Sequence, residues 1–107
     1  MTNARLKQIE KQIQKTKEDL LQIGEMRPGT LTKQYRNPKD KKGPFYQISY
    51  TYKMKGKSEY VRPQHVVALR LQIDSYKKFK TLVEKWVDLA PEHSRLKIDL
   101  LNKKQLK

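Results

Sequence analysis

The chain has 107 residues, a mass of 12.8 kDa and a formal net charge of +14, with 34% charged and 36% hydrophobic residues. This length suits one small domain, and the apolar content lies below the globular average of about 45–50%. The absence of cysteine excludes disulfides, thiolate zinc sites and cysteine nucleophiles.

The N-terminus and the apolar runs set the expectation for location. Charged residues between Arg5 and Lys11 interrupt any signal-peptide core. No apolar run approaches the roughly 20 residues that cross a bilayer. We therefore expect a cytoplasmic or nucleoid-associated protein with no membrane partner.

An apolar stripe with heptad spacing predicts an N-terminal helix from about Asn3 to Ile23. Asn3 is the expected N-cap, while Gly24, Pro28 and Gly29 mark the stop. The narrow stripe fits two arrangements equally well, a helical homodimer or packing against the chain's own C-terminal helix. The stripe consists of Leu6, Ile9, Ile13, Thr16, Leu20 and Ile23.

Between Thr30 and Arg62 the apolar period changes to two, which predicts a three-stranded antiparallel sheet. The expected strands are 30–36, 45–53 and 58–62. The second strand has the clearest alternation, and its expected helix-facing side chains are Tyr46, Ile48, Tyr50 and Tyr52.

Two turns separate these strands. Residues 37–44 form the first, a long loop in which Pro38 and Pro44 are expected to prevent strand pairing. Residues 54–57 form the second, a tight turn in which Gly56 is available for a positive φ.

Pro63 suits the first turn of a long helix whose broad apolar face covers one side of the sheet. Ala90, Pro91 and Glu92 interrupt the pattern, so we expect a break there. A short final helix near 96–101 and a frayed basic tail at 103–107 should follow. The apolar face comprises Val66, Leu69, Ile73, Tyr76, Phe79, Leu82, Val83, Trp86, Val87 and Leu89.

Together these elements predict an α+β fold that forms one structural domain. Its three parts are a heptad helix over 1–25, a basic sheet over 26–64, and long packing and short terminal helices over 65–107. A homodimer formed through helical contacts is the expected assembly.

Catalytic and metal-binding patterns are not found in the sequence. His65 and His93 lack the spacing and carboxylate pairing of a metal or general-base site, and surface or capping roles fit them better. The acidic residues are scattered, and the single glycines form no phosphate loop. We predict a protein that is not an enzyme and that uses no cofactor or metal.

Positive charge is concentrated in the predicted sheet. Residues 26–64 carry ten of the 25 basic residues and only two acidic ones, Asp40 and Glu59, for a net charge of +8. Cationic charge on a structured segment that also bears aromatic residues indicates a polyanionic partner, of which nucleic acid is the commonest.

One face of the predicted sheet carries side chains suited to base and phosphate recognition. Glutamine pairs with adenine and arginine with guanine, and an antiparallel ribbon fits a major groove about 12 Å wide. Polar residues also alternate outward on any half-buried sheet, which is the plainer interpretation. The predicted nucleic-acid-binding residues of this face are Thr32, Gln34, Arg36, Gln47, Ser49, Thr51 and Lys53.

Basic residues in the turns and at the sheet's end are predicted to bind phosphates, adding affinity without sequence information. Turn lysines also protect sheet edges from aggregation, which is the alternative use. Tyrosines that stack on unpaired bases would indicate single strands, but their alternation is more typical of core packing. The predicted phosphate-binding residues are Lys39, Lys41, Lys42, Lys55, Lys57 and Arg62.

Several short motifs lie along the sheet segment and the following helix. They are Pro28-Gly29-Thr30-Leu31, Tyr35-Arg36, Gly43-Pro44-Phe45-Tyr46, Ile48-Ser49-Tyr50, Gly56-Lys57, Tyr60-Val61-Arg62-Pro63 and Tyr76. With these motifs, over residues 4–101, the chain resembles an uncharacterised family of small prokaryotic proteins encoded near transposases and other mobile elements. The resemblance implies a helix, a small sheet, a long helix and a mobile-element setting, with no implied catalysis. Members carry a cysteine-rich stretch resembling a metal-binding knuckle, where this chain has lysines in 37–42.

The predicted function is non-enzymatic binding of nucleic acid, with duplex DNA favoured and the sheet's polar face as the interface. Its expected role is that of a mobile-element accessory factor or regulator. Two alternatives stay open: an RNA-binding accessory protein, and a helical adaptor that binds a transposase-like protein.

Overall fold

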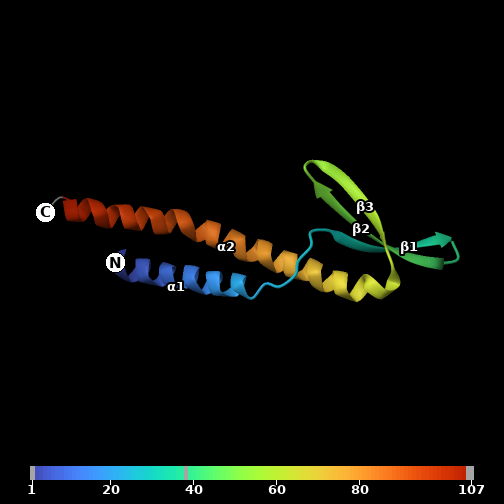
Figure 1. The fold of residues 1–107 in the computed structure, drawn as a ribbon. Helices are drawn as coiled ribbons and strands as arrows, with labels where there is room; N and C mark the ends of the chain where they lie inside the picture. The colour runs from blue at the N-terminus through green and yellow to red at the C-terminus, as the bar shows by residue number, and fades with distance from the viewer. Residues whose placement is uncertain (1, 38, 106–107) are drawn as a thin grey trace. The chain divides into compact units, whose positions relative to one another are not determined.

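The computed structural model describes residues 2–37 and 39–105 (Figure 1). Its elements are α1 (Thr2–Leu21), β1 (Thr30–Asn37), β2 (Lys42–Tyr52), β3 (Lys55–Val61), a 3-10 turn η1 (Pro63–His65) and α2 (Val66–Gln105). This confirms the predicted α+β layout of a helix, a three-stranded antiparallel sheet and a long helix. The chain forms two compact units. The helical unit combines the N-terminal segment up to Ile23 with the C-terminal segment from Lys78, and the sheet unit spans 24–77.

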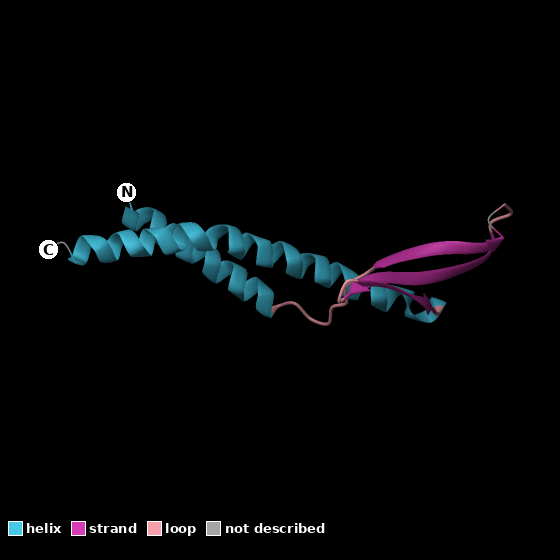
Figure 2. Ribbon diagram, turned by 90° about the horizontal axis from the view of Figure 1, so that it is seen from above, coloured by secondary structure: helices cyan, strands magenta, loops and turns pink. Residues whose placement is uncertain are grey.

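In the helical unit, α1 lies alongside the C-terminal part of α2 in both views (Figures 1 and 2). The first four residues of the predicted heptad stripe are buried here, with Ile9 and Thr16 both 0% exposed, and Leu20 and Ile23 are half-buried. The Thr16 hydroxyl donates to the carbonyl of Gln12 at 2.9 Å, which satisfies its polarity inside an apolar seam. The seam is therefore occupied within one chain, and the expected homodimer stays a prediction. Asn3 lies inside α1, so its predicted N-cap role is wrong.

Polar contacts fix the antiparallel register of these two helices. Arg5 donates two hydrogen bonds to the Glu92 carboxylate, at 2.8 and 3.0 Å. These bonds lower the pKa of Glu92, so that it stays ionised. Further along, the Lys17 ammonium lies 5.0 Å from the Trp86 ring centroid. Arg5, near the start of α1, contacts Glu92, whereas Lys17, near the end of α1, contacts Trp86, which comes earlier in α2. Antiparallel packing requires this order.

The helix α2 continues through Pro91 for 40 residues, so the predicted break and short final helix are wrong. Proline removes one backbone hydrogen bond and disfavours a helix interior by about 3 kcal/mol. Here α2 is held to α1 on both sides of the proline, through Trp86 and through Glu92. The expected tail is helical up to Gln105, and residues 106–107 lie outside the described residues.

The sheet has the strand order β1-β2-β3 and packs one face on the beginning of α2 (Figure 2). Ile48 in the central strand is 0% exposed and is the centre of this core. Val61, Val66 and Ile73 complete the buried cluster, with Leu31, Tyr46 and Leu69 at its margin. We call the sheet face that bears Ile48 the core face.

The first turn is shorter than predicted, because β2 already begins at Lys42. Asn37 pairs with Lys42 and Tyr35 pairs with Pro44, so Pro44 lies within the ladder. The pairing of β3 with β2 starts only at Tyr46, which leaves this end of β2 with one neighbouring strand. Proline is tolerated where a strand edge is unpaired. Pro38 lies outside the described residues.

The second turn also differs from the prediction. Tyr52 pairs with Lys55, so the two turn residues are Lys53 and Met54, with φ of 50° and 66°. Two-residue hairpins with both φ values positive match the twist of the strands. An L-residue in this conformation costs about 1–2 kcal/mol, and a turn at Gly56 was expected for that reason. Gly56 instead pairs with Thr51 inside the ladder.

The helices of the structure can also be compared with the requirements of a membrane-spanning segment. Within residues 2–37 and 39–105, no helix combines the length and the apolar character that a membrane span requires.

Candidate nucleic-acid interface

The strand register gathers polar side chains on the sheet face opposite Ile48. Thr32 lies across from Gln47, which lies across from Tyr60. Ser49 has a similar place in the next row, with Ser58 as one neighbour. Since directly paired residues share a face, three strands contribute to one surface, which we call the polar face. It consists of Thr30, Thr32, Gln34, Arg36, Phe45, Gln47, Ser49, Thr51, Ser58 and Tyr60.

The polar face is largely open to solvent. Gln34, Arg36 and Ser49 are exposed, whereas Thr32 and Gln47 in the centre are half-buried. The Thr32 hydroxyl donates a long hydrogen bond, 3.5 Å, to the backbone carbonyl of Gln47. The structure thus brings the predicted amide, hydroxyl and guanidinium groups of β1 and β2 together on one accessible surface.

Both carboxylates of the basic segment are turned away from the polar face. Asp40 in the first turn accepts a hydrogen bond from the Asn37 amide at 3.1 Å. Glu59 lies across from Ile48 on the core-face side and accepts from Tyr50 at 2.8 Å and from Arg27 at 2.9 Å. The bonds from Tyr50 and then Arg27 lower the pKa of Glu59, so its charge persists and Arg27 balances it. Among the described residues, no carboxylate therefore belongs to the polar face.

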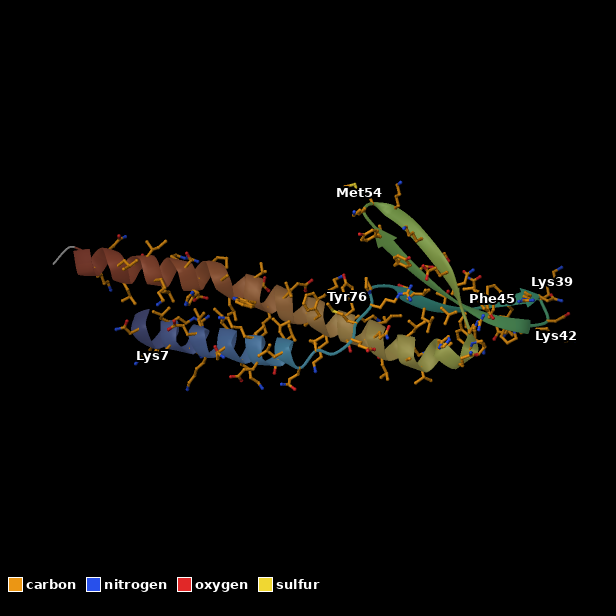
Figure 3. The ribbon with its side chains drawn as sticks, in the orientation of Figure 1. Lys7, Lys39, Lys42, Phe45, Met54 and Tyr76 are labelled. Carbon is orange, nitrogen blue, oxygen red and sulfur yellow. The ribbon has the colours of Figure 1, made fainter. Side chains whose placement is uncertain are left out.

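Lysines flank the sheet at its two ends. Lys39, Lys41 and Lys42 lie in and beside the first turn, at the opposite end of the sheet from Met54 in the second turn (Figure 3). All three are exposed, and Lys41 holds a φ of 53°. Lys53 is the other turn residue beside Met54. Cationic groups therefore stand at both ends of the sheet.

Lys55 and Lys57, the predicted phosphate contacts of the second turn, pair with Tyr52 and Tyr50 on the core-face side of the hairpin. Lys53 is a turn residue beyond the end of β2, so its predicted place in the strand's polar face is wrong. Lys57 and Lys53 lie 5.5 and 5.3 Å from the ring centroid of Tyr52. Tyr52 itself is 54% exposed, so its expected packing against the helix is also wrong.

Sequence reasoning missed the residues that β3 contributes to the polar face, Ser58 and Tyr60. Tyr60 is 57% exposed and lies beside Gln47. A usable signal was present in β3, since Val61 is the apolar residue that must face the core. Counting back from Val61 with a period of two places Tyr60 and Ser58 on the other side.

Arg62 lies beyond the end of β3 and not on the polar face. It lines a hollow of about 420 Å³ in the sheet unit together with Arg27, Tyr60, His65 and Leu69. Glu59, which pairs with Arg27 at 2.9 Å, also lines the hollow.

The two histidines lie in different units. His65 ends the η1 turn of the sheet unit. His93 in the helical unit lies 3.4 Å from the Glu10 carboxylate, and Lys97 lies 3.8 Å from the same group. Within the described ranges, no cluster of three or more histidine, aspartate or glutamate side chains is arranged to hold a metal ion.

Fold and surface define a small basic α+β chain whose half-covered sheet presents a polar face free of carboxylates in the part that the structure describes. Comparisons with protein-family models, curated proteins and solved structures found no match. The resemblance to a mobile-element family therefore stays a prediction.

Proposed function

We propose that this protein binds duplex DNA through the polar face and performs no catalysis. The observation that carries the proposal is the polar face itself, with amide, hydroxyl and guanidinium groups and no described carboxylate, on a sheet with lysines at both ends. Such side chains read base edges in the major groove, while lysines bind phosphates. The motif resemblance adds the proposal of an accessory or regulatory role in a mobile-element setting.

The shape of the sheet supports entry into a groove. From Gln34 to Phe45, strands β1 and β2 pair without β3, whose pairing begins at Tyr46. A two-stranded ribbon fits the major groove, about 12 Å wide. Gln34 and Arg36 lie on this ribbon, and Gln47 follows on the central strand. These three side chains are the proposed base-reading groups.

A salt-titrated binding assay tests the proposal. Random duplex, single strand and structured RNA of matched length are compared over a range of salt concentrations. If six to eight phosphates are contacted, log affinity for duplex should fall with log salt at a slope of about −5 to −7. Tightest binding to duplex with this slope supports the proposal, whereas a slope near zero contradicts phosphate contact.

Single substitutions separate base reading from phosphate binding. Arg36→Ala and Gln47→Ala should change sequence preference, since a bidentate pair contributes about 1–3 kcal/mol of base discrimination. Lys41→Ala should weaken binding to all sequences alike and make the salt slope shallower by about 0.9. Lys7→Ala, in the helical unit, removes the same charge from an exposed position and is the matched control. Equal losses on every sequence for Arg36→Ala and Gln47→Ala would refute base reading.

A second candidate is single-stranded nucleic acid, including RNA loops, and Tyr60 favours it. Its ring is 57% exposed beside Gln47, and an exposed aromatic ring can stack on an unpaired base for about 1–3 kcal/mol. Duplex DNA remains the first proposal, because only one such ring lies exposed among the amides and hydroxyls of this face. The single-strand and RNA arms of the same assay decide between the two.

A further inference from the structure

The tip of the β2–β3 hairpin presents an apolar side chain to solvent. Met54 is 98% exposed and projects from the end of the hairpin (Figure 3). Single exposed apolar residues are common on protein surfaces. The backbone conformation and the charge around Met54 distinguish it from such residues.

The backbone of the turn that bears Met54 has an unusual conformation. Lys53 and Met54 both hold positive φ values, a conformation for which two-residue hairpins favour Asn-Gly. The chain keeps two long side chains where its backbone disfavours them. Strained conformations of this kind are concentrated at functional sites.

The residues around Met54 are positively charged. Residues 52–57, which we call the hairpin tip, contain Lys53, Lys55 and Lys57 and no acidic residue. Lys53 and Lys57 both lie within 5.5 Å of the Tyr52 ring centroid. The nearest acid in sequence, Glu59, already pairs with Arg27 at 2.9 Å. The apolar side chain of Met54 is thus flanked by three lysines, with no carboxylate within the hairpin tip.

We propose that the hairpin tip enters the minor groove of duplex DNA and that Met54 inserts between two base pairs and kinks the duplex. This inference rests on the proposed function. Proteins that bend DNA insert apolar wedges, methionine among them, from the minor groove and produce kinks of about 20–90°. The three lysines would bind the phosphates on either side of the groove.

The hairpin has the length for this contact. From Gln47 to its end at Tyr52 the strand advances about 17 Å, at about 3.3 Å per residue, and the turn residues Lys53 and Met54 follow it. A minor groove lies about 17 Å from the neighbouring major groove along the axis, half of a helical turn of about 34 Å. The hairpin tip therefore reaches the adjacent minor groove while Gln47 stays in the major groove.

An anionic membrane is the competing partner for an apolar tip with lysines. Stable membrane anchoring takes two signals, such as two acyl chains or one chain with a basic patch. Met54 is the one apolar aliphatic side chain of the hairpin tip, and alone it supplies little buried area. The chemistry of the tip therefore favours DNA, and vesicles containing phosphatidylserine serve as an arm of the test.

The test is Met54→Gly, because it separates wedge insertion from folding. Glycine accepts the positive φ without strain, so thermal stability should rise while DNA bending falls. Bending is measured by energy transfer between dyes at the ends of a short duplex, and unstacking by 2-aminopurine fluorescence. We expect wild type to bend the duplex, and Met54→Gly to lose most of the bend, bind up to about tenfold more weakly and keep its salt slope.

Met26→Ala is the matched control, since Met26 is another exposed methionine, 44% exposed, outside the hairpin. It should bend DNA as wild type does. Salt-dependent duplex binding without a bend, or an equal bend from Met54→Gly, would overturn the wedge and leave the proposed function standing. No salt-dependent duplex binding at all would overturn both. Binding of phosphatidylserine vesicles that depends on Met54, without duplex bending, would assign the hairpin tip to membranes and refute the inference.

Discussion

Replacing Gly29 with alanine should lower the free energy of unfolding of the sheet unit by about 2–5 kcal/mol, from backbone strain and overpacking together. Gly29 has a φ of 149°, which L-residues rarely adopt. An added Cβ would lie 2.9 Å from Cγ1 and 3.0 Å from Cδ1 of Ile48, and 3.2 Å from the carbonyl oxygen of Ser49. Ile48 is fully buried and has no room to turn away. The strain therefore falls on the centre of the sheet's core.

Gly24→Ala is the matched control for this prediction. No heavy atom lies within 4 Å of the position its Cβ would take, and the change should alter stability by less than about 0.5 kcal/mol. Urea unfolding followed by circular dichroism measures both variants. A stable Gly29→Ala protein would show that the chain does not approach Ile48 as closely as the structure has it. Since the same core holds the polar face in place, Gly29→Ala should weaken DNA binding as well.

The sequence predicted those features that depend on local periodicity. The alternation of β2 placed Gln47, Ser49 and Thr51 on one face, because a buried Ile48 sets the parity of the strand. The start of β3 depended on the turn before it, and the usual glycine signal pointed to Gly56. Lys53 and Met54 adopt the positive φ values instead, so turn chemistry did not predict that β3 begins at Lys55.

Two other features depend on tertiary contacts that a sequence pattern does not contain. Heptad spacing alone fits either a second copy or an internal partner, and the burial of Ile9 within one chain decides for the internal one. Likewise the proline rule is local, whereas contacts of Trp86 and Glu92 with α1 stabilise the helix on both sides of Pro91. Packing outweighs local propensity at this position.

Placing negative charge on the polar face should have the largest effect on binding. Ser49 and Thr51 are exposed on the central strand, so Ser49→Glu with Thr51→Glu is compatible with the fold. Two carboxylates facing phosphates create like-charge contacts that cost several kcal/mol, and duplex affinity should fall by about 10- to 1,000-fold. The loss should diminish at high salt, since screening weakens the repulsion.

The matched control is Ser94→Glu with Asn102→Glu, which makes the same change in formal charge at exposed positions of α2 in the helical unit. It tests whether affinity depends on the protein's net charge or on charge at the polar face. Net charge alone acts through the long-range field, which is weaker than direct contact with phosphates. We expect the control to weaken binding by only about two- to threefold. Circular dichroism of both variants verifies that each is folded.

Fluorescence anisotropy of a labelled duplex at one fixed low salt concentration tests where on the protein the DNA binds. Binding at the polar face should give a large loss of affinity for Ser49→Glu with Thr51→Glu and a small one for Ser94→Glu with Asn102→Glu. Equal dissociation constants for the two folded variants would show that the polar face does not meet the DNA.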